Sequence, residues 1–548
     1  MAAALKWTPI GGLGEVGKNM MAFEYDRSIL IVDTGVMFPE STMHGVDLVI
    51  PDYQWLKEKK DQIKGIVVTH GHEDHTGSVA YVVADFPNVP IYCTPLTRGL
   101  LEVKLKEAKL LERTSLNTVQ TNGVVQIGPF KVEFFRMCHS IPDNVGLGIT
   151  TPAGLVVHSG DFKLDQTPVD GKPSDFGKLA EFANRGVMAL FSDSTNAETP
   201  GFTPSEREIE PAFEHVFRDA EGRIIVATFA SLISRVQQVV NTCEIYGRKL
   251  AVAGTSMTEN VKMAQRMGYL KIPDNMLVKL EDAVRMPAHD VCIMATGTQG
   301  EPGAVLGRMS TGKHPMLQVQ EGDTIVMSSH PIPGNDEAIH GIINRLYQKG
   351  ANVIYPPIMR VHVSGHACQE EQKMLINLVR PKYFVPIHGE LRQLKAHARS
   401  AKSLGWADDK IVVVENGTPI EFKDGVARKL ERIPGGYVFV DGSLVGDVGP
   451  MVIRDRDMLA REGFVLLVIR RESNGRITQQ PEIITRGFVH TKESEELIDT
   501  LEKKVGEALS GIDNTGSEDK IKNIATDALN RQINLETKRR PLIVTVVA

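Results

Sequence analysis

Short apolar, β-branched runs alternate with amphipathic stretches along the first part of the chain, which predicts strands separated by helices. The predicted strands are 20–25, 28–32, 65–70, 132–135, 155–158 and 187–191. Most of these runs deliver polar residues or glycine at or just after their C-terminal end. In layered α/β folds, sites assemble at that edge of a sheet. The strand ends are therefore the places to search for functional residues.

From about Pro204 the pattern becomes a strand and helix alternation with four further strands, which is typical of a separate parallel-sheet domain. These strands are 224–228, 249–253, 291–295 and 324–327. Strands resume at 351–355, 383–388 and 411–414, and we expect them to complete the first domain. The middle domain is then an insertion.

After about Pro450 a third unit is expected, with strands 464–469 and 483–488, two helices and a closing strand at 542–546. The first helix carries one apolar face, as expected for a helix packed on a sheet. That face is formed by Leu497, Ile498, Leu501, Val505 and Leu509. The expected domains are 1–203 with 351–449, then 204–350, then 450–548.

Length and composition agree with a multidomain globular protein. The 548 residues are too many for one compact core, and 24% are charged and 42% hydrophobic. We find no long apolar run and no export signal at the N-terminus, so no membrane association is expected. The five scattered cysteines do not form a disulfide framework, which favours a cytoplasmic location.

The formal net charge of -6 argues against binding nucleic acid mainly through an overall positive field. It leaves open a local basic channel or phosphates held by metal ions. The 16 histidines cluster in short segments beside aspartate, serine and glycine. These segments are where we expect the chemistry.

A glycine motif near the N-terminus, Gly12-Leu13-Gly14-Glu15-Val16-Gly17, matches the dinucleotide-binding pattern, and Asp33 follows near the expected distance. That motif should open a helix, whereas the residues that follow are predicted to form two short strands. A glycine loop close to a phosphate or metal site is the better interpretation.

The segment His70-Gly71-His72-Glu73-Asp74-His75 places three imidazoles and two carboxylates directly after a predicted strand. Imidazole nitrogen and carboxylate oxygen are ligands that suit zinc or manganese in an open, water-bearing site. The alternative is a polar loop with incidental histidines, but this density of polar groups is costly unless something binds it. The segment therefore predicts half of a metal site.

This segment resembles the H-x-H-x-D-H signature of the metallo-β-lactamase superfamily. The resemblance implies two divalent metal ions, Zn²⁺ or Mn²⁺, and further ligands in Met137-Cys138-His139-Ser140, His158-Ser159-Gly160-Asp161 and Pro386-Ile387-His388. It also implies that Asp33 orients the ligands from outside. By resemblance, one ion is bound by His70, His72 and His139, the other by Asp74, His75 and His388, and Asp161 bridges them.

Three further segments resemble the added motifs of the β-CASP nucleases: Phe191-Ser192-Asp193-Ser194-Thr195, Val363-Ser364-Gly365-His366 and the His388 segment. In that family, histidine at the third motif goes with RNA substrates. The resemblance makes His366 the candidate general acid and Asp193 the residue that holds it, with Asp74 also counted as catalytic. A structural histidine on a strand face shared with His362 is the alternative for His366.

Over essentially the whole chain the sequence resembles the bacterial ribonuclease J family, on the segments 11–19, 192–196, 296–302 and 328–335. This implies a metallo-β-lactamase αββα sandwich with an inserted parallel α/β domain of the β-CASP type and a small α+β C-terminal domain. It also implies cleavage of single-stranded RNA, 5′-to-3′ exonuclease activity that favours 5′-monophosphate ends together with internal cleavage, and a homodimer or higher homo-oligomer. Ser231, Ser364 and His366 are the candidates for the 5′-phosphate pocket.

Two alternatives stay open at this point. A hydrolase of a small ester or lactam would share the fold but leaves the insertion unexplained. An inactive metal-binding or scaffold subunit would be expected to have lost ligands, and none is missing from the predicted set. The glycine loops at Thr296 and Ser328 are either phosphate cradles or plain strand-to-helix turns.

Overall fold

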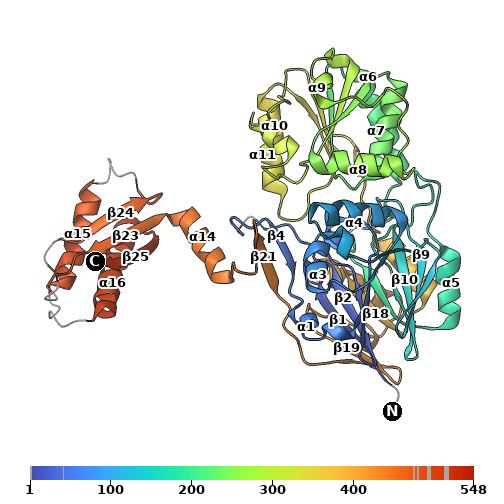
Figure 1. The fold of residues 1–548 in the computed structure, drawn as a ribbon, viewed down its shortest axis with the longest axis horizontal. Coiled ribbons are helices and arrows are strands. Elements are labelled where there is room, and N and C mark those ends of the chain that lie inside the picture. The colour runs from blue at the N-terminus through green and yellow to red at the C-terminus, as the bar shows by residue number, and fades with distance from the viewer. Residues whose placement is uncertain (1–2, 41, 473–475, 478–479, 490–494, 511–516) are drawn as a thin grey trace. The chain divides into compact units, whose positions relative to one another are not determined.

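The computed structural model describes residues 3–40, 42–472, 476–477, 480–489, 495–510 and 517–548 (Figure 1). The chain divides into two compact units, Met1–Phe38 with Leu48–Val438, and Pro39–Asp47 with Phe439–Ala548. Both units have buried apolar cores of their own.

The first sheet of the larger unit has eight strands in the order β20-β19-β1-β2-β3-β5-β6-β7. Its N-terminal strands pair as antiparallel neighbours, whereas β3, β5, β6 and β7 run parallel. The strands are β1 (Leu5–Gly11), β2 (Met20–Tyr25), β3 (Ser28–Val32), β5 (Ile63–Val67), β6 (Ile91–Cys93), β7 (Leu116–Thr118), β19 (Ile420–Lys423) and β20 (Val426–Lys429).

The second sheet has six strands in the order β18-β12-β11-β10-β9-β8. The two sheets share one apolar core, in which the rings of Trp7 and Phe191 lie 4.7 Å apart between centroids. The strands are β8 (Val124–Ile127), β9 (Phe130–Arg136), β10 (Val145–Thr151), β11 (Gly154–His158), β12 (Val187–Asp193) and β18 (Tyr383–Ile387).

Helices cover the sandwich. Phe182, Leu375 and Ala401 pack from three helices against Phe135 and Phe384 of the six-stranded sheet, so that sheet is buried on both faces. The three helices are α5 (Phe176–Arg185), α12 (Gln369–Val379) and α13 (Leu391–Ser403). Two more helices, α3 (Val79–Asp85) and α4 (Pro95–Glu107), lie in the chain between strands of the eight-stranded sheet. The expected αββα sandwich is confirmed.

The inserted domain is built on a five-stranded parallel sheet in the order β14-β15-β13-β16-β17. Helices lie on both sides of it (Figure 1). Its strands are β13 (Ile224–Ala227), β14 (Lys249–Val252), β15 (Val291–Ala295), β16 (Thr324–Met327) and β17 (Asn352–Ile354). Its main helices are α6 (Glu210–Asp219), α7 (Ile233–Ile245), α8 (Thr255–Arg266), α10 (Val305–Ser310) and α11 (Asp336–Gln348).

Two strand predictions are wrong in detail. The run 351–355 was expected to complete the first domain, but β17 pairs with β16 of the inserted sheet. A β-branched run shows that a strand forms without showing which sheet it joins. The run 411–414 forms no strand. Of its four residues, only Ile411 pairs with the sheet, through an isolated bridge to Phe384 in β18.

The smaller unit confirms the expected α+β order. Two helices, α15 (Glu495–Leu509) and α16 (Glu518–Thr537), bury apolar residues such as Leu501 and Leu529 against Val465 and Leu467 of its sheet. The sheet order is β24-β23-β25, with β23 (Phe464–Ile469), β24 (Glu482–Arg486) and β25 (Leu542–Val547), and α14 (Pro450–Glu462) precedes it.

The segment 39–47 was not expected in this unit. The guanidinium of Arg456 in α14 donates a 3.0 Å hydrogen bond to the carbonyl of His44, which ties that segment to the C-terminal part.

Among the described helices, none has both the length and the apolar character needed to cross a lipid bilayer.

Candidate metal centre

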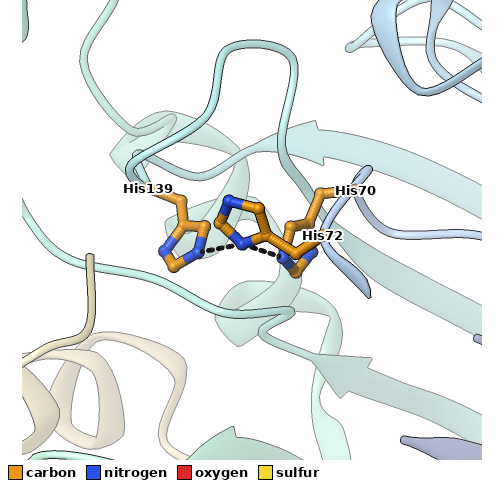
Figure 2. Close-up of side chains that lie close together, drawn as sticks. All are labelled: His70, His72 and His139. Carbon is orange, nitrogen blue, oxygen red and sulfur yellow. Dashed lines mark hydrogen bonds between the residues drawn. The ribbon is translucent and has the colours of Figure 1, made fainter. Parts of the chain in front are cut away.

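Three histidines bring their ring nitrogens to one point (Figure 2). His72 Nδ1 lies 3.0 Å from His70 Nε2 and 3.1 Å from His139 Nε2. His139 donates from Nδ1 to the carbonyl of Gly365 at 2.7 Å, which leaves the Nε2 lone pair facing His72. Lone pairs that converge repel one another unless a cation lies between them. This is the donor set of a metal site.

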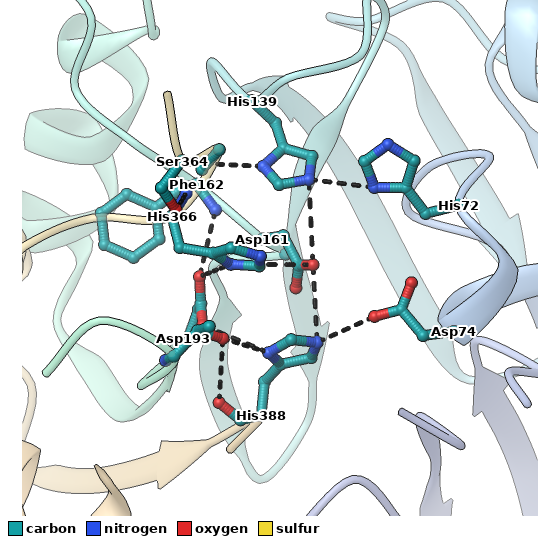
Figure 3. Close-up of polar contacts among 12 residues, drawn as sticks. His72, Asp74, His139, Asp161, Phe162, Asp193, Ser364, His366 and His388 are labelled. Atoms are coloured by element: carbon teal, nitrogen blue, oxygen red, sulfur yellow. Dashed lines mark hydrogen bonds and ion pairs between the residues drawn. The ribbon is translucent and has the colours of Figure 1, made fainter. Parts of the chain in front are cut away.

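A second group is centred on the carboxylate of Asp161 (Figure 3). Its Oδ2 lies 3.1 Å from His75 Nε2 and 3.5 Å from His388 Nε2. His388 Nε2 also lies 3.2 Å from Asp74 Oδ2. Asp74, His75, Asp161 and His388 can each turn one ligand atom toward a common point.

Asp161 Oδ2 also faces the first group, at 3.7 Å from His70 Nε2 and 4.0 Å from His139 Nε2. One carboxylate oxygen therefore lies within reach of both histidine groups. Most candidate ligands lie just after a strand: His70 follows β5, Asp161 follows β11, and His388 follows β18. Asp74 and His75 instead lie in the short helix α2 (Glu73–Thr76) that comes after β5.

The pKa values of the first group leave its imidazoles neutral. Burial holds the pKa of His70 and His139 well below the ordinary histidine value, and neighbouring imidazoles lower them further. Burial lowers the pKa of His72 to about 4. A histidine must be neutral to bind a metal, so these three are in the ligating form near neutral pH.

The second group is charged. Burial raises the pKa of Asp161 and Asp74, but the surrounding imidazoles outweigh it and hold both pKa values well below the ordinary range. Burial lowers the pKa of His75 and His388, yet their carboxylate neighbours raise both well above the usual value. Without a metal ion, protons on these imidazoles balance the carboxylates. A divalent cation would take their place.

Asp33 lies outside the two groups of candidate ligands and contacts His75 of the second group. Its Oδ2 lies 2.8 Å from His75 Nδ1, so that Nε2 of the same ring turns toward Asp161. Its other oxygen accepts hydrogen bonds from the backbone N–H of Thr69 at 2.8 Å and from the Thr69 hydroxyl at 3.1 Å. The φ angle of Asp33 is 64°, a left-handed conformation that this hydrogen bonding stabilises.

His366 lies at the edge of the same centre. Its Nδ1 is 2.8 Å from Asp193 Oδ2 and 4.0 Å from Asp161 Oδ2, and its ring stacks on that of His388 at 5.3 Å. The segment 361–366 forms no strand, so the alternative of a histidine on a strand face does not hold. The side chain of His366 is 20% exposed and that of Asp74 is 30% exposed, whereas His70 is fully buried. The centre therefore opens to solvent beside His366 and Asp74.

Four family models match the chain. They are the metallo-β-lactamase superfamily over residues 13–193, the ribonuclease J β-CASP domain over 221–346, a Zn-dependent metallo-hydrolase RNA specificity domain over 354–413, and the ribonuclease J C-terminal domain over 451–548.

Curated relatives cover nearly the whole length. Ribonuclease J of Synechocystis sp. is 46% identical over 90% of this chain and 78% of its own. Ribonuclease J2 of Bacillus subtilis is 40% identical over 98% of this chain and 97% of its own, and ribonuclease J of Thermus thermophilus is 41% identical over 98% and 94%. The chain belongs to the ribonuclease J family.

Membership of the ribonuclease J family makes the chain a metal-dependent, RNA-processing nuclease. This family membership rules out the alternative of a hydrolase that acts on a small ester or lactam. A solved structure, of a protein of unknown function from Enterococcus faecalis, covers 76% of this chain and all of its own with a TM-score of 0.54 and 15% identity. That likeness supports the fold alone.

The predicted 5′-phosphate residues are only partly brought together. Ser364 Oγ accepts hydrogen bonds from Asn196 Nδ2 at 2.8 Å and from the backbone N–H of His366 at 3.1 Å. Both contacts use the Ser364 oxygen as an acceptor, and a serine hydroxyl can also donate one hydrogen bond. Ser231 lies in the turn before α7, half-buried, and its carbonyl accepts from the Ile233 N–H at 2.8 Å.

Three residues that contact the centre were not singled out as site residues from the sequence. The Thr195 hydroxyl lies 2.7 Å from His388 Nδ1 and donates to Asp193. Asn144 Nδ2 donates to the backbone carbonyl of Asp161 at 2.7 Å, and Asn19 Nδ2 donates to that of Asp74 at 3.1 Å. A lone asparagine or threonine carries no spacing signal. The neighbouring motifs were the only available pointers to them.

Proposed function

We propose that this ribonuclease J family member holds two divalent ions, most readily Zn²⁺ with Mn²⁺ as the second choice. One ion would be bound by the three histidines of the first group and the other by Asp74, His75 and His388. The observation that carries this is the place of Asp161 Oδ2, within 3.7 Å of His70 Nε2 and 3.1 Å of His75 Nε2. A shared carboxylate is typical of two-ion sites with ions about 3.5–4 Å apart.

When bound, such a pair supplies hydroxide near neutral pH and neutralises the phosphate oxygens. The chain's own residues orient the histidines and supply the proton. Asp33 holds Nδ1 of His75, so that Nε2 of this ring faces Asp161, and Asp193 holds Nδ1 of His366 and fixes that ring beside the centre. His366, partly exposed, is the proposed donor of the proton that the leaving oxygen of the RNA takes up.

The further part of the proposal concerns the substrate end. We propose 5′-to-3′ exonuclease activity that favours a 5′-monophosphate, together with internal cleavage. The proton of the Ser364 hydroxyl supports a phosphate contact two residues from His366, so a 5′-phosphate held there would lie near the scissile bond. Ser231 is the second candidate for this pocket.

Self-association through the C-terminal domain and a cytoplasmic location complete the proposal. Ile484 and Val544 flank Leu466 across β24, β23 and β25, and each is about two-fifths exposed, which supports an apolar contact surface on that sheet. All five cysteines are buried, and the structure pairs none of them, which supports a reducing compartment.

Three RNAs of one sequence test the activities separately. The 5′-monophosphorylated linear RNA should release mononucleotides faster than its 5′-triphosphorylated form, and a circular RNA should be opened by internal cleavage alone. Equal rates on the two linear RNAs would contradict the 5′-phosphate pocket. An intact circle would contradict the endonuclease activity.

A further inference from the structure

The N-terminal glycine loop, residues 11–19, is not explained by the proposed mechanism. It joins β1 to β2 and is buried apart from Gly14 and Val16. Its backbone lies against the segment that carries the last ligand: the Gly14 N–H donates to the Gly389 carbonyl at 2.9 Å, and the Gly389 N–H donates to the Gly12 carbonyl at 3.3 Å. The loop therefore holds the residue next to His388.

A buried ion pair shapes this loop. Lys18 Nζ lies 2.8 Å from Glu15 Oε1, and both side chains are almost completely buried. The same Glu15 oxygen accepts from the Gly12 N–H at 3.0 Å and from Asn416 Nδ2 at 2.8 Å. Burying a charged pair is costly unless its hydrogen bonds are satisfied, as they are here. The loop is thus a fixed support and not a flexible turn.

The loop ends in Asn19, which contacts the ligand segment directly. The Asn19 N–H and its side-chain Nδ2 both donate to the Asp74 carbonyl, at 3.0 and 3.1 Å. Nδ2 also lies 3.5 Å from Asp74 Oδ2 and 3.2 Å from His75 Nε2. Gly35 closes the other side, because a Cβ there would lie 1.6 Å from the Asp74 carbonyl oxygen.

Asp74 is the candidate ligand that most needs such support, because its side chain is 30% exposed. Within the described part of the chain, the other polar groups recorded at its carboxylate are His75 Nε2 at 3.3 Å and His388 Nε2 at 3.2 Å. Both are candidate ligands themselves, and once they bind an ion they no longer donate to Asp74. The amide of Asn19 then remains as the donor from outside the site.

We infer that Asn19 is a positioning residue for the ion bound by Asp74, His75 and His388, and that the glycine loop exists to place it. The inference rests on the proposed two-ion site. It adds a residue that supports one of the two ion sites and not the other. The first group, around His72, has no contact of this kind with Asn19 among the described residues.

Titration of the metal-stripped full chain with Mn²⁺ by calorimetry tests this. We expect two sites in the wild-type chain, and in Asn19→Ala one site weakened by about 10–100-fold while the other is unchanged, as for the loss of an outer hydrogen-bond partner. The kcat on RNA should fall with little change in KM. Asn19→Ser, which keeps a small polar group but cannot reach the carboxylate, should show the same selective loss.

Asn117→Ala is the matched control, because Asn117 in β7 donates to the carbonyl of Ile91 in β6 and to that of Ser115 just before β7, and it makes no recorded contact with the candidate ligands among the described residues. Its two constants should equal those of the wild type. Two unchanged constants in both Asn19 variants, or an equal loss at both sites, would overturn the inference alone. A wild-type chain without a second ion would overturn the proposed two-ion site and the inference with it.

Discussion

His366 and Asp193 lie 173 positions apart in the sequence, yet Nδ1 of the imidazole is 2.8 Å from Oδ2 of the carboxylate. The other oxygen of Asp193 lies 3.3 Å from Nδ1 of His388. One buried carboxylate thus contacts Nδ1 of the proposed proton donor and Nδ1 of a candidate metal ligand. This links acid chemistry to the metal centre through a single residue.

Asp193→Asn should lower the rate of RNA hydrolysis by about 100-fold, the lower range for loss of a positioned acid. Burial lowers the pKa of His366, but the carboxylates of Asp193, which also makes a hydrogen bond to it, and of Asp161 together raise the pKa above its usual value. Without the charge of Asp193 the pKa falls, less of the imidazole is protonated near neutral pH, and the alkaline limb of the kcat profile moves to lower pH.

Thr195→Val is the control for this pH profile. It removes the hydroxyl beside His388 and Asp193 but leaves the pair between Asp193 and His366 in place. Its rate should fall without movement of the alkaline limb. An alkaline limb that stays in place in Asp193→Asn would show that His366 is not the acid.

Asp33→Ala should weaken metal binding by about 10–100-fold, because His75 loses the partner of its Nδ1 and the ring is no longer oriented. Thr69→Ser keeps a hydroxyl that donates to Asp33 and should bind metal like the wild type. Metal content after dialysis, measured by elemental analysis, compares the three proteins. Equal metal content in Asp33→Ala and wild type would rule out an orienting role.

Ser364→Ala should reduce the preference for 5′-monophosphorylated over 5′-triphosphorylated RNA by about tenfold, as expected for a lost hydrogen bond to a charged group. Ser364→Thr retains the hydroxyl and should keep the preference. The ratio of kcat/KM on the two RNAs is the measurement. A ratio that survives in Ser364→Ala would move the 5′-phosphate pocket away from this residue.

The sequence predicted candidate ligands most readily where they are dense along the chain. His70 to His75 form a local signal, and the family resemblance pointed to His139, Asp161 and His388, each of which follows a strand. Asn19 could not be found in this way. Its contact with Asp74 depends on a loop conformation set by the buried pair of Lys18 and Glu15.

The fold was predictable to the level of elements. The strands at 20–25 and 28–32 form as expected and exclude the helix that a dinucleotide site requires. The strand at 351–355 forms as well, but only its hydrogen-bonded partner β16 assigns it to the inserted sheet. The segment 39–47 joins the C-terminal unit through contacts such as that of His44 with Arg456, which no local pattern records.

The two-ion site is tested most directly by adding Mn²⁺ stepwise to the metal-stripped chain while RNA hydrolysis is followed. The rate should rise until two equivalents per chain are bound. In His75→Ala the rate of RNA hydrolysis should fall by more than about 100-fold, which exceeds the effect of removing a residue that only contacts a ligand. His340→Ala, an exposed histidine on α11, should behave as the wild type. Full activity in the stripped chain, or saturation at one equivalent, would contradict the account.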